Sequence, residues 1–270
     1  MPHARLPIPL YYELHGRGAR LLSISGSGSN LNMRPTIVTH PALAELEILS
    51  YEHRGLGRSG AAPETSQMAD YADDAARLLD HVGWDSAHVI GVSFGGMVAQ
   101  HLALRHPERV QRLVLACTSS GGAGGSSYAL HTLMHLSTAE RWQTTLPLFD
   151  TRPAEVEKMR QLMPVILEQV VDPATDRGAR TQLRARAAHD TWERLSQLRS
   201  PTLVCAGRYD GIAPLANSVA LASRIPGAKL WVFEGGHSFL HQDRRALSTV
   251  ARFLQGADLA DAQGSPLGAA

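Results

Sequence analysis

A serine among small residues is the first feature of this sequence that could do chemistry. Ser93 lies in the segment Gly91-Val92-Ser93-Phe94-Gly95, which matches the pattern G-x-S-x-G. An apolar run typical of a buried strand (87–92) precedes it, and a segment with helical spacing follows it. A serine on such a sharp turn has strained backbone angles, and glycine neighbours avoid the clashes that larger residues would cause. The pattern predicts a nucleophilic serine, and a tight structural turn is the alternative.

A serine hydroxyl becomes a good nucleophile only when a base takes its proton and a carboxylate orients that base. Two later apolar runs are followed by suitable residues: Asp210 comes after 202–207, and His237 comes after 229–235. The carboxyl ends of parallel strands meet at one edge of a sheet, where such folds hold their ligands. The order Ser93, Asp210, His237 therefore predicts a catalytic triad. A loop-capping aspartate and a structural histidine are the alternatives.

A glycine-rich loop, Ser25-Gly26-Ser27-Gly28, follows an earlier apolar run (21–25). Such a loop could cradle a phosphate, connect two elements, or present a backbone N–H where negative charge develops. The phosphate interpretation is disfavoured, because Leu31 stands in the place of a third glycine and no Gly-Lys-Ser/Thr follows.

The composition shows no bias toward a charged partner. The chain has 270 residues, with 26 Lys+Arg, 25 Asp+Glu, a formal net charge of +1 and 44% hydrophobic residues. This balance offers no basic field for nucleic acid, so a small molecule is the expected partner. No run reaches the roughly 20 apolar residues that span a bilayer, and the N-terminal segment lacks a signal-peptide pattern. We expect a cytoplasmic protein that does not bind membranes, and a homodimer remains open.

The two cysteines, Cys117 and Cys205, each lie in an apolar run. Two buried free thiols are the favoured interpretation, and a disulfide is the alternative. Neither cysteine has another cysteine or a histidine at metal-ligand spacing, so no metal site is expected.

The elements that position these residues alternate along the chain. Segments with helical spacing cover 68–83, 94–108 and 244–254. Near-continuous apolar runs, typical of strands covered on both faces, occur at 21–25, 47–52, 87–92, 112–118, 202–207 and 229–235. This alternation predicts an α/β fold with a mostly parallel central sheet and helices on both faces.

The alternation stops between Thr118 and Ser200, where about three helical segments follow one another. We predict a core at 1–119 and 200–255, a helical cap at 120–199 and a disordered tail at 256–270. The cap should cover the serine and line a substrate pocket, although Met and aromatic residues on helices more often belong to the core. The candidate pocket residues are Tyr128, Met134, Trp142, Met163, His189 and Trp192.

Taken together, these segments resemble the α/β-hydrolase superfamily from about Leu10 to Leu254. The resemblance rests on GVSFGGMVAQHLALRHPERVQRLVLACTSSG, PTLVCAGRYDGIAP and EGGHSF. In addition, YEHRGLGRSG is similar to the family's D-x-R-G-x-G-x-S loop, with Glu52 where Asp is more frequent. The resemblance is greatest to the branch containing 3-oxoadipate enol-lactonases, small esterases and cofactor-free perhydrolases. It implies the α/β-hydrolase fold with a helical cap insertion.

The resemblance also implies a chemistry. The family's first loop usually reads H-G-x-G or H-G-x-P, whereas Ser25 stands here in place of the histidine. By position, the backbone N–H groups of Ser27 and Phe94 would form the oxyanion hole. Ser93, in place of the aspartate of dehalogenases and epoxide hydrolases, implies acyl transfer. The implied activity is cofactor-free hydrolysis of a small or medium carboxylic ester or lactone through an acyl-enzyme. A carbon–carbon bond hydrolase, a perhydrolase and a non-catalytic ligand-binding protein are the alternatives.

Overall fold

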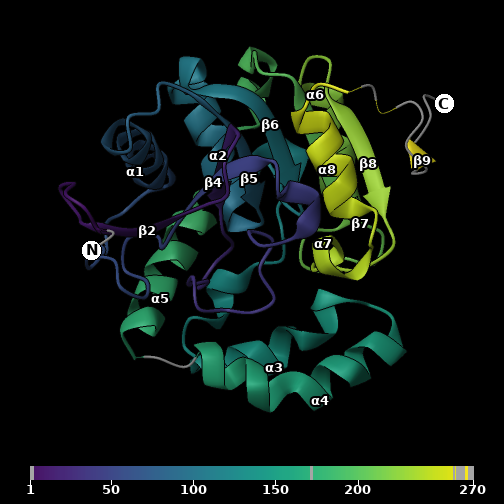
Figure 1. The fold of residues 1–270 in the computed structure, drawn as a ribbon. Coiled ribbons are helices and arrows are strands. Elements are labelled where there is room, and N and C mark those ends of the chain that lie inside the picture. The colour runs from purple at the N-terminus through teal and green to yellow at the C-terminus, as the bar shows by residue number, and fades with distance from the viewer. Residues whose placement is uncertain (1–2, 171–172, 258, 260–264, 267–270) are drawn as a thin grey trace.

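A mixed nine-stranded sheet lies at the centre of the described residues (Figure 1). The computed structural model describes residues 3–170, 173–257, 259, 265 and 266. The strand order is β1-β2-β4-β3-β5-β6-β7-β8-β9, and all neighbours from β4 to β8 in this order run parallel. The strands are β1 (His3–Ala4), β2 (Leu10–His15), β3 (Ala19–Ile24), β4 (Leu46–Tyr51), β5 (Ala87–Val92), β6 (Val110–Ala116), β7 (Thr202–Gly207), β8 (Lys229–Phe233) and β9 (Ser265–Pro266).

The six strands predicted from apolar runs are β3 to β8, so the predicted fold class is confirmed. The strands that the sequence did not reveal, β1, β2 and β9, pair antiparallel at the two edges of the sheet. Edge strands carry mixed side chains because only part of their surface is covered. In β2, for example, Leu10 is buried while Glu13 is only partly buried and Leu14 is 45% exposed.

Helices cover both faces of the sheet. Successive residues of a strand point to opposite faces, and the neighbours Leu22 and Leu21 of β3 accordingly belong to two different buried clusters, one on each face. The core helices are α1 (Met68–His81), α2 (Phe94–Arg105), α6 (Leu215–Arg224), α7 (Phe239–Gln242) and α8 (Ala246–Leu254). Each face therefore has its own buried cluster, which explains why the strands read as continuous apolar runs.

The predicted helical insertion lies between β6 and β7. It contains α3 (Thr138–Phe149), α4 (Pro153–Val170) and α5 (Pro173–Ala187). Figure 1 shows α3 and α4 side by side below the sheet, with α5 rising along the core. At one point α5 contacts the core without room for a side chain, because a Cβ on Gly178 would overlap the carbonyl oxygen of Gly55. We refer to α3–α5 as the cap.

The predicted disordered tail lies mostly outside the described residues. Within its described part, Leu259 is buried and Ser265–Pro266 pair with β8.

The two cysteines are free and buried, as favoured from the sequence. No helix among the described residues combines the length and apolarity needed to cross a membrane.

Candidate active site

Ser93 occupies the sharp turn between β5 and α2. Its φ is 55°, a left-handed conformation that is costly for a residue other than glycine. Two hydrogen bonds hold this backbone: Ser93 N–H donates to Ala116 O (2.9 Å), and Thr118 Oγ1 donates to Ser93 O (2.8 Å). The turn also needs glycine at Gly95, where a Cβ would overlap the carbonyl oxygen of Ile24. The surroundings therefore hold the serine in a conformation that it would not adopt alone.

Asp210, His237 and Ser93 form one hydrogen-bonded row at the carboxyl edge of the sheet. Asp210 follows β7 and His237 follows β8. His237 Nδ1 lies 2.8 Å from Asp210 Oδ2, and His237 Nε2 lies 3.0 Å from Ser93 Oγ. An ionised carboxylate only accepts hydrogen bonds, so this arrangement assigns the ring proton to Nδ1. The Nε2 lone pair then faces the serine hydroxyl and can accept its proton.

The acid and the histidine are each held by further contacts. The second oxygen of Asp210, Oδ1, accepts the backbone N–H groups of Ile212 and Ala213, both at 2.8 Å. The backbone N–H of His237 donates to Phe149 O (2.6 Å), and the Phe149 ring packs edge-on against the imidazole at 5.6 Å. Because Phe149 ends α3, the cap contacts the histidine directly.

The two amides expected to form an oxyanion hole lie beside Ser93. Phe94 is the first residue of α2, so its N–H has no acceptor within the helix. The Ser27 N–H makes no hydrogen bond to the described residues. The loop that carries Ser27 touches the serine, since a Cβ on Gly26 would lie 3.6 Å from Ser93 Cβ. Both donors are thus free to bind a developing negative charge, which favours acyl chemistry at this position.

The side chain of Glu52 is hydrogen-bonded to the segment that follows Ser27. Its buried carboxylate accepts the backbone N–H of Leu31 (3.1 Å) and of Arg58 (2.5 Å), and also pairs with the Arg58 guanidinium (2.6 Å). The Glu52 carboxylate thus ties two backbone segments together, and the longer glutamate side chain fits because Gly57 beside it has no side chain.

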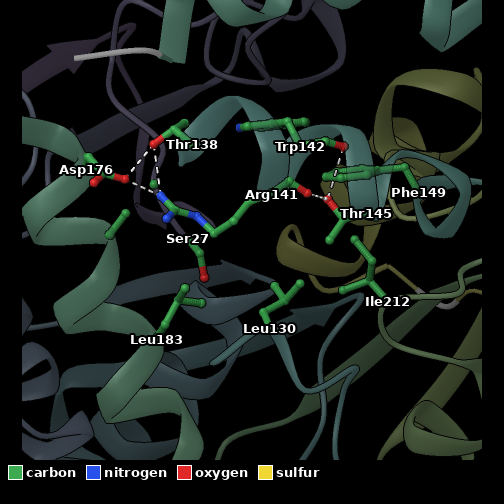
Figure 2. Close-up of a pocket in the computed structure, with 12 residues that line it drawn as sticks. Ser27, Leu130, Thr138, Arg141, Trp142, Thr145, Phe149, Asp176, Leu183 and Ile212 are labelled. Carbon is green, nitrogen blue, oxygen red and sulfur yellow. Dashed lines mark hydrogen bonds and ion pairs between the residues drawn. The ribbon is translucent and has the colours of Figure 1, made fainter. Parts of the chain in front are cut away.

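A cavity of about 110 Å³ lies between the core and the cap, next to the hydrogen-bonded row of Ser93, His237 and Asp210 (Figure 2). Ser93 and His237 do not line it, but three lining residues connect it to them: Ser27, Phe149 and Ile212. Figure 2 shows Leu130, Leu183 and Ile212 across the cavity from Trp142 and Phe149. The complete lining is Ser27, Gly28, Leu130, Thr138, Arg141, Trp142, Thr145, Phe149, Asp176, Ala179, Leu183 and Ile212.

Of the six residues predicted to line a pocket, Trp142 lines this cavity and the other five do not. His189 and Met163 are buried elsewhere, and Trp192 packs against the core beneath Arg224. Tyr128 is 38% exposed, and Met134 is partly buried outside the lining. The spacing of residues along one helix face would have predicted the lining better than residue type did. The lining residues of α3 recur at three- and four-residue steps on one face: Thr138, Arg141, Trp142, Thr145 and Phe149.

The two charged residues that line the cavity are paired with each other, and the same carboxylate, Asp176, also pairs with Arg180 (2.9 Å). Arg141 forms an ion pair with Asp176 and also donates to Thr138. Burial opposes ionisation of Asp176, but hydrogen bonds from Thr138, Arg141 and Arg180 outweigh it and lower the Asp176 pKa to about 2. Asp176 therefore stays ionised at neutral pH, and the Arg141 guanidinium is occupied by Asp176, Thr138 and the carbonyl oxygen of Leu136.

One group of possible metal ligands overlaps the row. Cys117 Sγ, Asp210 and His237 have donor atoms within 4.8 Å of one another. Burial, followed by the nearby charge of Asp210, raises the pKa of the Cys117 thiol well above its ordinary value. A thiol held in its protonated form is a poor metal ligand.

His189, expected in the pocket, does not line the cavity and instead contacts His101 of α2. His101 Nε2 is 3.3 Å from His189 Nδ1, and His189 Nε2 is 3.0 Å from Ser119 O. Burial lowers the pKa of His101 to about 3 and that of His189 to about 4, so both rings are neutral at pH 7. The pair is a structural link between α2 and the segment that follows α5.

Comparison with known proteins shows the family to which the chain belongs. The family model described as the alpha/beta hydrolase fold matches residues 14–244. RutD of Azorhizobium caulinodans, assigned as a carbamate hydrolase, is 32% identical over 85% of this chain and 88% of its own. A poly(3-hydroxyalkanoate) depolymerase of Ectopseudomonas oleovorans is 29% identical over 87% of this chain and 84% of its own. The enol-lactonase structure from Burkholderia xenovorans LB400 has a TM-score of 0.82 at 24% identity, covering 94% of this chain and all of the enol-lactonase. The chain belongs to the α/β-hydrolase fold family.

Proposed function

We propose that this α/β hydrolase is a serine hydrolase that cleaves a carboxylic ester or lactone through an acyl-enzyme. The observation that carries the proposal is the row in which His237 Nε2 lies 3.0 Å from Ser93 Oγ while His237 Nδ1 lies 2.8 Å from Asp210. Ser93 would be the nucleophile, His237 the general base and Asp210 the residue that orients the imidazole.

The proposed first step forms the acyl-enzyme. Ser93 Oγ attacks the carbonyl carbon while its proton moves to His237 Nε2, and Asp210 stabilises the imidazolium. The carbonyl oxygen becomes an oxyanion that accepts hydrogen bonds from the N–H groups of Ser27 and Phe94. His237 then gives its proton to the departing alkoxide oxygen. In the second step a water molecule, deprotonated by His237, attacks the acyl carbon and releases Ser93 and the carboxylic acid.

The cavity supports an uncharged and largely apolar group on the substrate. Leu130, Leu183 and Ile212 face Trp142 and Phe149 across it. Its charged residues are paired with each other, and Arg54, near the same edge of the sheet, is paired with the buried Asp74 (2.7 Å). A substrate carboxylate would find no unpaired cation among the residues lining the cavity, so we propose a neutral ester or lactone. The polyester named for the Ectopseudomonas relative is consistent with this class.

A carbamate is the second candidate, because RutD is 32% identical. The same row could attack a carbamate carbonyl, and the two substrates differ only in one atom beside that carbonyl. Matched p-nitrophenyl substrates, one an ester and one a carbamate of equal chain length, separate the candidates. We expect kcat/KM for the ester to exceed that for the carbamate by at least tenfold, and the reverse order would assign the carbamate.

Reaction with a fluorophosphonate tests the proposed nucleophile. The reagent should add to Ser93 in the folded protein, and peptide mapping should locate the adduct there. Ser93→Ala should not react, whereas Ser27→Ala keeps its backbone N–H and should react normally. Folded protein that gives no adduct, or an adduct at another serine, would rule out the proposal.

A further inference from the structure

The loop that carries Ser27 is held from two opposite sides. From the core, the ring of His53 places Nε2 3.1 Å from the carbonyl oxygen of Ser25. From the cap, Oε1 of Gln182 on α5 accepts the backbone N–H of Gly28 at 2.8 Å. These two hydrogen bonds lie on either side of the peptide group that presents the Ser27 N–H. The sequence predicted neither residue, because the partners are 28 and 154 positions apart.

His53 contacts the loop that carries one expected oxyanion donor, Ser27, and the side chain of the residue that carries the other, Phe94. Its ring is 1% exposed and packs edge-on against Phe94 (5.4 Å), whose N–H is the second donor. Tyr51 and Tyr71 hold the ring on other sides, at 5.0 and 5.7 Å. Burial lowers the pKa of His53 to about 4, so the ring is neutral at pH 7. Since Nε2 faces a carbonyl, it carries the proton and donates to Ser25 O.

Gln182 is fully buried, yet only one end of its amide is used. Its Nε2 has no hydrogen-bond partner among the described residues. A buried donor without an acceptor costs free energy, so an apolar side chain would suit packing alone better. Polar residues that break a packing rule of this kind are expected where function requires them. The bond that Gln182 does make is to Gly28, whose positive φ of 68° sets the direction of the loop.

The serine side chains of the loop do not replace these two contacts. The hydroxyls of Ser25 and Ser27 are buried and have no partner among the described residues. Ser25, which stands in place of the histidine in the family's H-G-x-G pattern, therefore does not anchor the loop through its side chain. A catalytic group is effective only when it is held within about 0.5 Å of its productive position, so a loop that lost these anchors would stabilise the oxyanion less well.

We propose that His53 and Gln182 are positioning residues that hold the Ser27 N–H toward the reacting carbonyl oxygen, His53 from the core and Gln182 from the cap. The proposal rests on the proposed function, because it assigns the parts that orient its oxyanion hole. Neither residue lines the cavity or touches the reacting atoms. Through Gln182, the cap contributes to the geometry of the oxyanion hole as well as to the substrate pocket.

The test measures kcat and KM for p-nitrophenyl butyrate, together with Ki for an alkyl trifluoromethyl ketone whose adduct places an oxyanion in the hole. Gln182→Met keeps the shape and removes the acceptor, whereas Gln182→Glu keeps an acceptor. His53→Met removes the donor, His53→Gln can still donate to Ser25 O, and His53→Asn is too short to reach it. The exposed Gln143→Met on α3 serves as the matched control.

We expect Gln182→Met and His53→Met each to lower kcat about 10- to 100-fold and to raise Ki by a similar factor, with KM changed less than threefold. Gln182→Glu and His53→Gln should retain at least a third of wild-type kcat, and Gln143→Met all of it. If His53→Met does not fold, His53→Asn should show the same loss. Folded variants with kcat and Ki within twofold of wild type, or with a change in KM alone, would overturn the proposal. A wild-type protein that neither hydrolyses esters nor binds the ketone would overturn the proposed function as well.

Discussion

Asp210 Oδ2 lies 2.8 Å from His237 Nδ1, and the other oxygen of the same carboxylate is already occupied by two backbone N–H groups. This division of the two oxygens determines how an amide would sit at position 210. The oxygen of an asparagine must accept from Ile212 and Ala213, so its NH₂ group would face the imidazole. An NH₂ group cannot accept the Nδ1 proton, and the histidine would be forced into the tautomer that protonates Nε2.

Asp210→Asn should therefore lower kcat by about 10³- to 10⁴-fold, because Nε2 could no longer accept the Ser93 proton. Stopped-time hydrolysis assays measure the loss, and thermal melting should show a Tm within a few degrees of wild type, since the backbone contacts remain. Asp243→Asn, which lies outside the row, is the control for removing a buried aspartate. A variant with more than a tenth of wild-type kcat would mean that Asp210 does not orient the base.

Gly95→Ala should disrupt the turn that holds Ser93. The added Cβ would overlap the Ile24 carbonyl oxygen and lie 2.6 Å from that of Ser25. Since backbone on both sides must move, we expect a loss of about 1–3 kcal/mol in the free energy of unfolding and at least a 100-fold loss of kcat. Urea denaturation and ester hydrolysis measure the two effects.

Gly83→Ala is the matched control, because Gly83 has a positive φ of 71° and nothing within 4 Å of an added Cβ. It should cost about 1 kcal/mol through backbone strain and leave kcat unchanged. If Gly95→Ala behaved like Gly83→Ala, the tight packing around the elbow would not matter for activity.

The protein should lose stability in mild acid because of three buried histidines. Burial lowers the pKa of His53 and of His189 to about 4, and that of His101 to about 3, against about 6.5 when unfolded. Below pH 6.5 the unfolded chain binds protons that the folded protein does not. The free energy of unfolding should therefore fall as the pH decreases from 6.5 toward 4, by up to about 1.4 kcal/mol per pH unit for each histidine.

Urea denaturation at pH 7.5, 6.0 and 5.0 measures this slope. His101→Gln should reduce the slope by close to one histidine's share, whereas substitution of the exposed His135 should leave it unchanged. The lowered carboxylate pKa values, about 2 for Asp176 and Asp243, act only at lower pH and do not obscure this window. A slope that is flat between pH 6.5 and 5, or equal in His101→Gln, would contradict the burial of neutral imidazoles.

Trp142→Leu should weaken substrate binding more than it slows the chemistry. Trp142 lines the cavity and stacks on Phe149 at 5.0 Å, but it does not contact the row. Loss of part of this apolar wall should raise KM for a p-nitrophenyl ester with a medium acyl chain about five- to thirtyfold, with kcat within threefold. Tyr128→Phe, outside the cavity, should change neither constant. An unchanged KM would place the substrate elsewhere.

The fold and the three residues of the row follow signals that are local in the sequence. β5, the G-x-S-x-G turn and α2 are continuous, and Asp210 and His237 each come directly after a buried strand. The parallel sheet then brings these strand ends together without any further information. The triad positions could therefore be predicted before the structure, whereas their roles await experiment.

The pocket and the supports of the oxyanion loop could not be predicted in the same way. Apolar and aromatic residues on a helix look alike whether they face the core or a ligand, and Met163 of α4, predicted to line the pocket, is buried outside the lining of this cavity. Gln182 carries no pattern at all, because its role depends on how α5 packs against a loop 154 residues earlier. The cavity lining and the Gln182–Gly28 hydrogen bond both depend on how the cap packs against distant parts of the chain.

Direct detection of the acyl-enzyme tests the central claim. The protein should be mixed with p-nitrophenyl butyrate, quenched in acid within the first turnovers, digested and analysed by mass spectrometry. The account predicts a butyryl group on the peptide containing Ser93, absent from Ser93→Ala, and released on incubation before the quench. Turnover of the ester with no acyl group on Ser93, or with the acyl group on another residue, would contradict it.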